Sequence, residues 1–295
     1  MTAGAPAREE LAMGGRRVSL PHPDKVLYPP AGFTRRDVLA YYLAIAPALL
    51  PHLAGRAVTL ARFPDGVDAP GWYQVNAPPG APEWMEPWSL RTSAGRPLRP
   101  CRIEEPAALA WAVARGALEL HPVRARPGTA AAGDLVLDLD PAAPASLLEA
   151  SAAALDARER LARRGLASAV KASGGRGGHV TAPLPAPLPF AESVALARAV
   201  AAELAAAAPT RFADRVARAG RDGKVLVDWR QNEPGRSLIA PWSLRAAGVP
   251  VVAAPLAWEE VEAAVAAGAP ARLRVSPQEA LARAGVQAVG APHLH

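Results

Sequence analysis

Three aspartates lie in two short apolar runs, and this arrangement constrains the fold more than any other feature of the chain. Asp138 and Asp140 belong to residues 134–140, and Asp228 belongs to residues 224–229. Side chains alternate along a strand, so the first two carboxylates share one face while the leucines between them occupy the other. Acids on an apolar strand repel each other and are costly to desolvate. One or two divalent cations would offset that cost, and a third acid from another strand would complete an oxygen-rich cage for Mg²⁺ or Mn²⁺.

A short acidic pair also has an ordinary interpretation. The pattern Asp-x-Asp is frequent at strand ends and as a helix cap, without any chemistry attached. Here the pair ends a strongly apolar run, where an acid without a partner has no structural use. This context favours a metal site over a chance pattern.

The composition indicates a globular protein with a basic balance. Of the 295 residues, 51% are hydrophobic, which is enough for a sizeable core, and the net charge is +6. A basic excess favours a polyanionic partner. Cys101 is the only cysteine, which excludes an intramolecular disulfide and suits a reducing cytoplasm. Residues 1–15 contain no apolar signal segment, and no stretch is long and apolar enough to predict a membrane span.

The order of periodic segments predicts an α+β (mixed α/β) fold. Residues 1–16 are expected to be a flexible tail, and residues 17–295 a single domain. We expect an N-terminal lobe over about 17–130 and a catalytic lobe over about 131–295. The second lobe is expected to read strand, helix, strand, turn, strand, helix, strand, as in a domain built around a sheet. Helices are predicted over 34–53, 106–116, 145–164, 191–208, 258–268 and 276–284.

A glycine-rich turn follows the first predicted strand–helix pair of this lobe. Four of the five residues 174–178 are glycines, which permit positive φ and let backbone N–H groups approach an anion. Ser173 adds a hydroxyl, Arg176 a charge and His179 an imidazole. The spacing does not match a Walker A loop. An ordinary hairpin turn with a surface arginine is the alternative, and the three polar residues together favour a phosphate-binding turn.

Other candidate residues are scattered along the chain. Asp228 is followed closely by Gln231, while Arg62 stands just before a Pro-Asp-Gly turn. The adjacent residues Trp72 and Tyr73 would face opposite ways in a strand, and we expect core packing to account for one of the two rings. In a turn both rings can be presented and can stack on a base. His121 ends an alternating run, and a lone histidine there is more often structural than catalytic.

Several of these motifs occur together in a known order. The runs are Asp24 to Pro29, Arg62 to Gly66, Leu118 to Pro122, Leu137 to Pro141, Ser173 to His179, Val227 to Asn232 and Ala240 to Arg245. In this order they span about residues 18–260, and the chain therefore resembles the polymerase domain of bacterial DNA ligase D, a branch of the archaeo-eukaryotic primase superfamily.

The resemblance implies a primase-polymerase fold, with an RRM-like catalytic sheet, flanking helices and an N-terminal α/β lobe. It implies a cytoplasmic, nucleoid-associated nucleotidyltransferase of non-homologous end joining, which adds ribo- or deoxynucleotides to 3′-OH ends at DNA breaks and gaps. The implied cofactors are two Mn²⁺ or Mg²⁺ ions. The implied partners are DNA ends and gapped duplex, NTP or dNTP, a DNA ligase and a Ku-type end-binding protein, with no membrane.

The same resemblance assigns roles to residues. Asp138, Asp140 and Asp228 would be catalytic and hold both metals, and Lys25 would bind a DNA 5′-phosphate. The nucleotide-binding set would be Arg62, Trp72, Tyr73, His121, Ser173, Arg176, His179, Gln231 and Arg245. The chain departs from the family pattern at three positions. The family's glycine turn usually carries lysine where this chain has Arg176, a lysine is frequent at the position of Ala61, and a basic residue is frequent at that of Val75. Because arginine is a planar fork and lysine a point charge, Arg176 would meet a phosphate with different geometry.

Two other functions are consistent with the residues alone. A non-catalytic module could bind DNA ends through arginines and bridge them for a separate ligase, with affinity that falls steeply with salt. Surplus carboxylates would repel DNA in such a module. A metal-dependent phosphoesterase would use similar acids but release phosphate or nucleotide instead of pyrophosphate.

Overall fold

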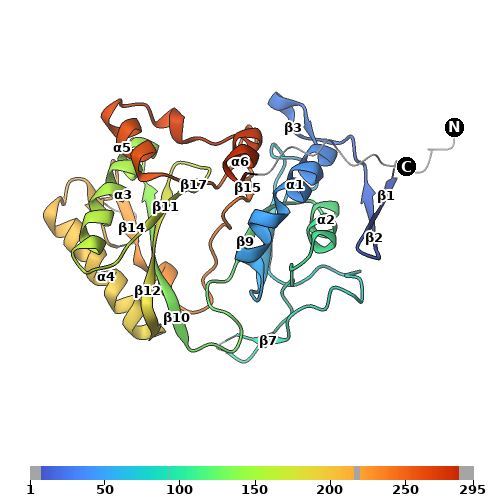
Figure 1. Ribbon diagram of the computed structural model, residues 1–295, viewed down its shortest axis with the longest axis horizontal. Helices are drawn as coiled ribbons and strands as arrows, with labels where there is room; N and C mark the ends of the chain where they lie inside the picture. The colour runs from blue at the N-terminus through green and yellow to red at the C-terminus, as the bar shows by residue number, and fades with distance from the viewer. Residues whose placement is uncertain (1–7, 93, 216–219, 286–295) are drawn as a thin grey trace. The chain divides into compact units, whose positions relative to one another are not determined.

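Two segments from the C-terminal part of the chain belong to the same compact unit as its N-terminal part. The computed structural model describes residues 8–92, 94–215 and 220–285. These form two compact units (Figure 1): the first contains 8–123, 242–251 and 276–285, and the second contains 124–241 and 252–275. The sequence predicted one junction near residue 130. In the structure the junction lies at residue 124, and two C-terminal segments belong with the first unit.

The second unit is a sheet with helices on one face. Within the described residues, six strands pair in the order β13-β14-β10-β12-β11-β17. Only β13 and β14 run parallel. The strands are β10 (Ala131–Pro141), β11 (Ala169–Ala172), β12 (Gly178–Pro189), β13 (Phe212–Ala213), β14 (Val225–Asp228) and β17 (Pro255–Leu256). The helices are α3 (Leu147–Ala162), α4 (Phe190–Ala207) and α5 (Trp258–Ala266), with 3₁₀ turns η2 (Trp229–Asn232) and η3 (Pro270–Leu273).

Strand alternation decides which face of this sheet is covered. Leu135, Leu137 and Leu139 of β10 are fully buried in one core with residues of α3, α4 and α5. Asp138 and Asp140, at the alternate positions, therefore lie on the opposite face. The prediction that these two acids share a face turned away from the leucines is confirmed, and so is the mixed α/β architecture.

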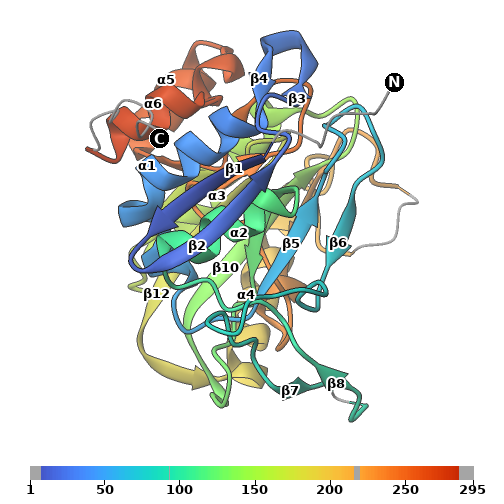
Figure 2. The same ribbon diagram turned by 90° about the vertical axis from the view of Figure 1, so that its right-hand side faces the viewer.

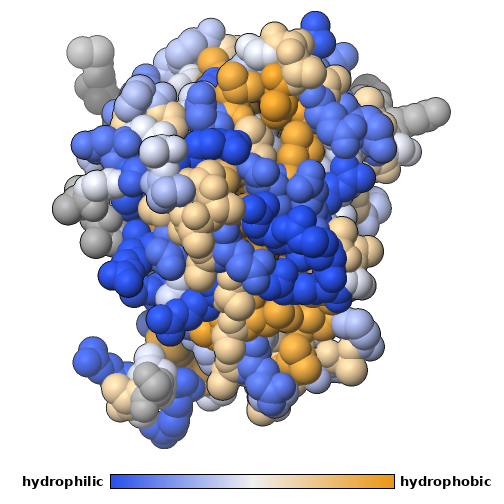
Figure 3. All heavy atoms as spheres, turned by 90° about the vertical axis from the view of Figure 1, so that its left-hand side faces the viewer, coloured by the Kyte–Doolittle hydropathy of each residue, from blue (hydrophilic) through white to orange (hydrophobic). Residues whose placement is uncertain are grey.

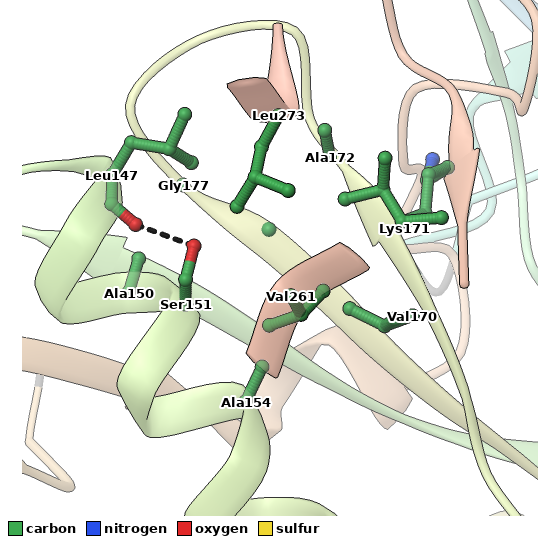
Figure 4. A pocket seen from close by; sticks show the side chains of 12 residues that line it. Leu147, Ala150, Ser151, Ala154, Val170, Lys171, Ala172, Gly177, Val261 and Leu273 are labelled. Carbon is green, nitrogen blue, oxygen red and sulfur yellow. Dashed lines mark hydrogen bonds between the residues drawn. The ribbon is translucent and has the colours of Figure 1, made fainter. Parts of the chain in front are cut away.

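Small residues let α3 lie close to the sheet (Figure 4). Ala150 and Ala154 of α3 face Val170 of β11 and Val261 of α5. The void among these side chains is about 10 Å³, roughly the minimum that holds one water molecule. The hydroxyl of Ser151 donates to a carbonyl of its own helix. The helix side of the sheet is thus filled by side chains, which leaves the other face for chemistry.

Figure 3 views the side on which α3, α4 and α5 lie in Figure 1, and hydrophilic side chains form a broad band across it. Ion pairs at the helix surfaces include Arg158–Glu262, Arg164–Glu203 and Arg211–Asp156. Exposed pairs of this kind each contribute little to stability. No helix among the described residues is long and apolar enough to cross a bilayer.

The first unit contains, in its described part, a three-stranded sheet in the order β6-β5-β9 and several small hairpins (Figure 2). The sheet strands are β5 (Val58–Arg62), β6 (Trp72–Gln74) and β9 (Ala117–Pro122), with helices α1 (Arg35–Leu53), α2 (Pro106–Ala114) and α6 (Pro277–Arg283). The short pieces are β1 (Arg8–Met13), β2 (Arg16–Pro21), β3 (Val26–Tyr28), η1 (Pro29–Ala31), β4 (Phe33–Thr34), β7 (Leu90–Arg91), β8 (Pro97–Leu98) and β15 (Leu244–Arg245). Strand β16 (Val251–Val252) lies at the boundary with the second unit.

The flexible tail predicted over residues 1–16 is wrong from residue 8 onward. Residues 1–7 lie outside the described part, but β1 and β2 form an antiparallel hairpin in which Met13 pairs with Arg16. Gly14 and Gly15 make the two-residue loop, both with positive φ. Two consecutive glycines at positive φ match the primed turn that suits the twist of a hairpin. The polar composition of this segment concealed that turn signal.

Helix α1 begins as the sequence predicts. The Thr34 hydroxyl accepts from the Asp37 N–H, and the Asp37 carboxylate accepts from the Thr34 N–H at 2.7 Å. This capping box satisfies two donors that the first helical turn leaves open. Pro47 and Pro51 lie inside α1, which continues without a break to Leu53.

Removing this cap should destabilise the first unit. In Thr34→Ala the Asp37 N–H loses its acceptor, so we expect the free energy of unfolding to fall by about 1 kcal/mol. Urea unfolding followed by tryptophan fluorescence measures the change. Thr210, exposed in the turn after α4, gives the matched control Thr210→Ala. Equal stability of the two variants would show that the capping box is unimportant.

Candidate functional site

The three predicted acids lie on one face of two neighbouring strands of the second unit. In the antiparallel pairing of β10 with β14, Asp138 is the direct partner of Asp228. On the other side of β10, Asp138 is the partner of His179 in β12. Side chains of direct partners share a face with Cβ atoms about 5 Å apart. Asp140 follows two residues later on that face, so one row presents Asp228, Asp138 and His179.

Protein donors occupy these carboxylates. His179 Nε2 lies 3.4 Å from Asp138 Oδ1, and Arg221 Nη2 donates to Asp140 Oδ2 at 3.1 Å. Asp228 Oδ1 accepts from the backbone N–H of the second residue after it at 3.0 Å, and Gln231 Nε2 lies 3.4 Å from Oδ2. Among the described residues no three acidic, histidine or cysteine side chains converge into a metal-ligand group. The backbone placement and the all-oxygen acid set fit a hard divalent cation, and metal binding stays a prediction.

The glycine-rich turn is built against the acidic strand. Ser173 Oγ donates to the Gly177 carbonyl at 2.9 Å and accepts from the Gly175 N–H at 3.3 Å. A Cβ at Gly177 would lie 2.3 Å from the carbonyl oxygen of Leu139, the residue between the two aspartates. Glycine at this position therefore allows the turn and the acids to be adjacent. Arg176 is exposed at the tip, whereas the Ser173 hydroxyl is engaged in shaping the turn.

A buried asparagine fixes the chain just after Asp228. Asn232 is 1% exposed; its Oδ1 accepts from the Val136 N–H at 2.9 Å and its Nδ2 donates to the Val136 carbonyl at 2.7 Å. In the β10·β14 register the partner of Val136 would be residue 230, but the strand ends at Asp228. The Asn232 amide thus takes the place of a strand residue. It lets the chain leave the sheet without orphaned backbone groups on β10.

Arg124 reinforces this arrangement from the loop before β10. Its Nη1 donates to the Gln231 carbonyl and to Asn232 Oδ1, both at 3.0 Å. Its Nη2 donates to the Asp134 carbonyl at 3.0 Å and forms an ion pair with the Asp134 carboxylate. Burial lowers the pKa of Arg124, which Asp134 partly counters. Sequence reasoning missed both Arg124 and Asn232, because their partners are distant in the chain.

The first unit gathers the aromatic candidates on one small sheet. Trp72 and Tyr73 lie on the edge strand β6 and are 44% and 62% exposed. The Arg62 guanidinium lies 4.9 Å from the centre of the Trp72 ring, in cation–π geometry. The Tyr73 ring meets the His121 ring edge-on at 5.2 Å between centroids. Because β6 is an edge strand, neither aromatic is buried, which corrects the expectation that one would be core.

His121 and Arg245 share a partner that the sequence did not single out. Glu119 of β9 is buried, and its Oε2 lies 2.8 Å from His121 Nε2. Its Oε1 lies 3.4 Å from Arg245 Nε and accepts from the Ala246 N–H at 2.8 Å. Burial alone would raise the pKa of Glu119, but the His121 hydrogen bond, the charge of Arg245 and the Ala246 N–H outweigh it and hold the pKa below its ordinary value.

One predicted residue, Lys25, and two departures from the family pattern, Ala61 and Val75, also lie in the first unit. Lys25 forms an ion pair with exposed Asp65, and this contact lowers the pKa of Asp65. Ala61 is buried in the row between Tyr73 and Glu119. Val75 is 44% exposed just beyond β6. The position of Ala61 thus has no room for a long basic side chain, whereas the exposed position of Val75 does.

The predicted site residues thus group by unit. The second unit holds Asp138, Asp140, Asp228, Ser173, Arg176, His179 and Gln231; the first holds Arg62, Trp72, Tyr73, His121, Arg245 and Lys25. The residues of the second unit combine acids with a glycine-rich turn, which is suited to a phosphate-bound cation. The residues of the first unit combine exposed aromatics with arginines, which is suited to a base and its phosphates.

Known proteins match this chain over most of its length. Residues 34–283 match the family model described as the LigD primase-polymerase domain. A multifunctional non-homologous end joining protein LigD of Mycobacterium bovis is 36% identical over 256 residues, which is 84% of this chain and 34% of the relative. A LigD protein of Pseudomonas aeruginosa is 32% identical over 85% of this chain and 30% of the relative. The chain spans about a third of the length of these relatives.

A solved structure matches the fold. It is the polymerase domain from Mycobacterium tuberculosis ligase D in complex with DNA, with a TM-score of 0.82 and 35% sequence identity. The match covers 91% of this chain and 94% of that one.

Asn232 should be essential to the stability of the second unit. Asn232→Ala leaves the Val136 N–H and carbonyl buried without partners, so we expect a loss of about 2–4 kcal/mol in the free energy of unfolding. Urea unfolding measures it. Asn76, an exposed residue whose Oδ1 accepts one backbone N–H, gives the control Asn76→Ala, with an expected loss of less than about 1 kcal/mol. Similar losses in both variants would contradict the role assigned to Asn232.

Two glycines of the glycine-rich turn test its close approach to the acidic strand. In Gly177→Ala the new methyl group collides with the Leu139 carbonyl, so we expect a loss of about 1–3 kcal/mol in stability. Gly175→Ala is the matched control, because a Cβ there meets only Ser173 Oγ at 3.6 Å. Thermal unfolding compares the two. The close approach of turn and acidic strand would be refuted by equal melting temperatures.

Proposed function

The chain belongs to the LigD primase-polymerase domain family, and from this premise we propose that it is a nucleotidyltransferase. It adds ribo- or deoxynucleotides to 3′-OH ends at DNA breaks and gaps, in bacterial non-homologous end joining. The observation that supports this most directly is the register that sets Asp138 opposite Asp228, with Asp140 on the same face. A DNA-binding module would gain nothing from three acids on one open sheet face, because they repel phosphates.

Two Mn²⁺ or Mg²⁺ ions are the cofactors that the acids would hold. Asp138, Asp140 and Asp228 would hold these ions, with Asp228 on the primer side. Such ions supply charge neutralisation of the triphosphate and a lowered pKa of the primer hydroxyl. The chain's own contribution is to hold its acids at fixed spacing, through the sheet and through the Asn232 amide behind Asp228.

The other candidates bind and orient the nucleotide. Arg176 and the backbone N–H groups of the glycine-rich turn would bind the triphosphate, beside Ser173. His179, 4% exposed next to Asp138, orients that carboxylate. In the first unit Trp72 and Tyr73 would stack on bases, and Arg62, His121 and Arg245 would be further nucleotide-binding residues. In the second unit Gln231 would be one as well.

DNA ends and gapped duplex are the proposed polymer substrates. The solved relative is a complex with DNA, and the net charge of this chain is +6. Lys25, whose side chain is 34% exposed, would bind the 5′-phosphate at a gap in exchange for Asp65. The longer relatives carry names of end-joining ligases, so we propose a DNA ligase and a Ku-type protein as partners in the bacterial cytoplasm, at the nucleoid.

The acids give the decisive test. In Asp138→Ala we expect primer extension on a gapped, 5′-phosphorylated duplex to fall by roughly 100-fold or more, while binding of the duplex persists. Asp222→Ala, at an exposed turn, is the control and should extend normally. The assay compares NTP with dNTP and Mg²⁺ with Mn²⁺, and it monitors pyrophosphate release. Full extension by Asp138→Ala, or release of phosphate instead of pyrophosphate, would overturn the proposal.

A further inference from the structure

A buried acid lies beneath the nucleotide-facing side chains of the first unit. The Glu119 side chain is 5% exposed. The two side chains that it contacts, His121 and Arg245, are 8% and 32% exposed. Tyr73, which packs on the His121 ring, is 62% exposed. Exposure thus increases outward from Glu119, and the outermost groups are a guanidinium and a phenol ring.

Strand register explains why these groups share one face. Glu119 is the direct partner of Ala61, and Ala61 is the direct partner of Tyr73. His121 lies two residues beyond Glu119 on the same face. The small side chain of Ala61 leaves Tyr73 free to lean onto His121. The acid, the imidazole and the phenol ring are therefore aligned by the β6-β5-β9 sheet itself.

The backbone that carries Arg245 is fixed separately. The Tyr42 hydroxyl donates to the Leu118 carbonyl at 2.6 Å and accepts from the Leu244 N–H at 3.0 Å. The Tyr28 hydroxyl donates to the carbonyl of Arg245 at 3.0 Å. Burial raises the pKa of Tyr28 and of Tyr42, so both hydroxyls remain neutral donors. These contacts fix the backbone of Arg245 but not the direction of its side chain. Glu119 contacts the Nε of that side chain and so orients it.

The ionised state of Glu119 decides the hydrogen bond to His121. A carboxylate can only accept, so His121 Nε2 must carry the hydrogen. This fixes the tautomer and the plane of the ring on which Tyr73 packs. Glu119 therefore contacts Arg245 directly, as an ion pair, and acts on Tyr73 through the His121 ring.

We propose that Glu119 is a positioning residue for the incoming nucleoside triphosphate, an inference that rests on the proposed function. It fixes the distance between a phosphate-binding group, Arg245, and a base-stacking group, Tyr73. Its charge by itself would act the other way, because a carboxylate near a triphosphate repels it. Removing the charge should therefore strengthen nucleotide binding if charge alone matters, and weaken it if position matters.

The test compares two variants with a matched control. Glu119→Gln keeps the shape but loses the charge, and Glu119→Asp keeps the charge but is too short to contact both partners. Glu104 provides the control Glu104→Gln, because it also accepts from an arginine Nε, of Arg102, and from a backbone N–H, of Gly55, each at 2.9 Å. Primer extension on a gapped duplex with ATP gives KM and kcat. Fluorescence titration gives the Kd for ATP, and thermal unfolding checks folding.

We expect both Glu119 variants to raise the KM and the Kd for ATP by about 10-fold, since a charge-assisted contact is lost in each. The kcat and the affinity for the duplex should change by less than about 3-fold, and Glu104→Gln should behave as wild type. A lower KM in Glu119→Gln, or an unchanged KM in both variants, would overturn the inference. Failure of the wild-type chain to extend any primer would instead overturn the proposed function, and the inference with it.

A measurement on the wild-type chain covers the case in which both variants unfold. With ¹⁵N-labelled histidine, NMR should show the His121 ring protonated at Nε2 before ligand is added. Addition of ATP should shift the ring signals, because Tyr73 moves against it on stacking. A His121 ring protonated only at Nδ1, or one whose signals ignore ATP, would also overturn the inference.

Discussion

The antiparallel pairing of β10 with β14 is the contact on which the rest of the candidate site depends. It sets Asp138 opposite Asp228 and turns the intervening leucines and valines into the core under α3, α4 and α5. Apolar burial on one face holds two like charges close together on the other. Burying one leucine side chain contributes about 2 kcal/mol, so three on β10 alone outweigh the repulsion of two partly exposed carboxylates. The Asn232 amide extends this pairing past the end of β14, and the glycine-rich turn rests on the β10 backbone between the two acids of that strand.

The two units handle buried charge in different ways. In the second unit the acids are partly exposed and contact side-chain donors such as Arg221 and Gln231. Under the proposed function a cation and a triphosphate would replace these donors. In the first unit Glu119 is buried and satisfied by permanent neighbours. Breaking a buried pair costs far more than breaking an exposed one. This difference separates acids that are suited to exchange ligands from an acid that is suited to orient its neighbours.

The family match and the residue departures have different consequences. The match covers the fold and most of the chain, and the strand register sets Asp138 opposite Asp228. The departures fall elsewhere. Arg176 is exposed at the tip of the turn, where its planar fork can contact two phosphate oxygens, and Ala61 is the small residue that lets Tyr73 and Glu119 share a face. The named departures from the family pattern therefore lie outside the three acids.

Local patterns in the sequence determined the helices and the alternation that puts Asp138 and Asp140 on one face. These depend on neighbours within a few residues, so a single sequence is enough to predict them. The order of the motifs also determined the family. Only the tertiary structure decided that Asp228 pairs with Asp138, that residues 242–251 return to the first unit, and that Arg124, Asn232 and Glu119 take part at all. Strand register and buried hydrogen bonds join residues up to a hundred or more positions apart, and no local periodicity encodes them.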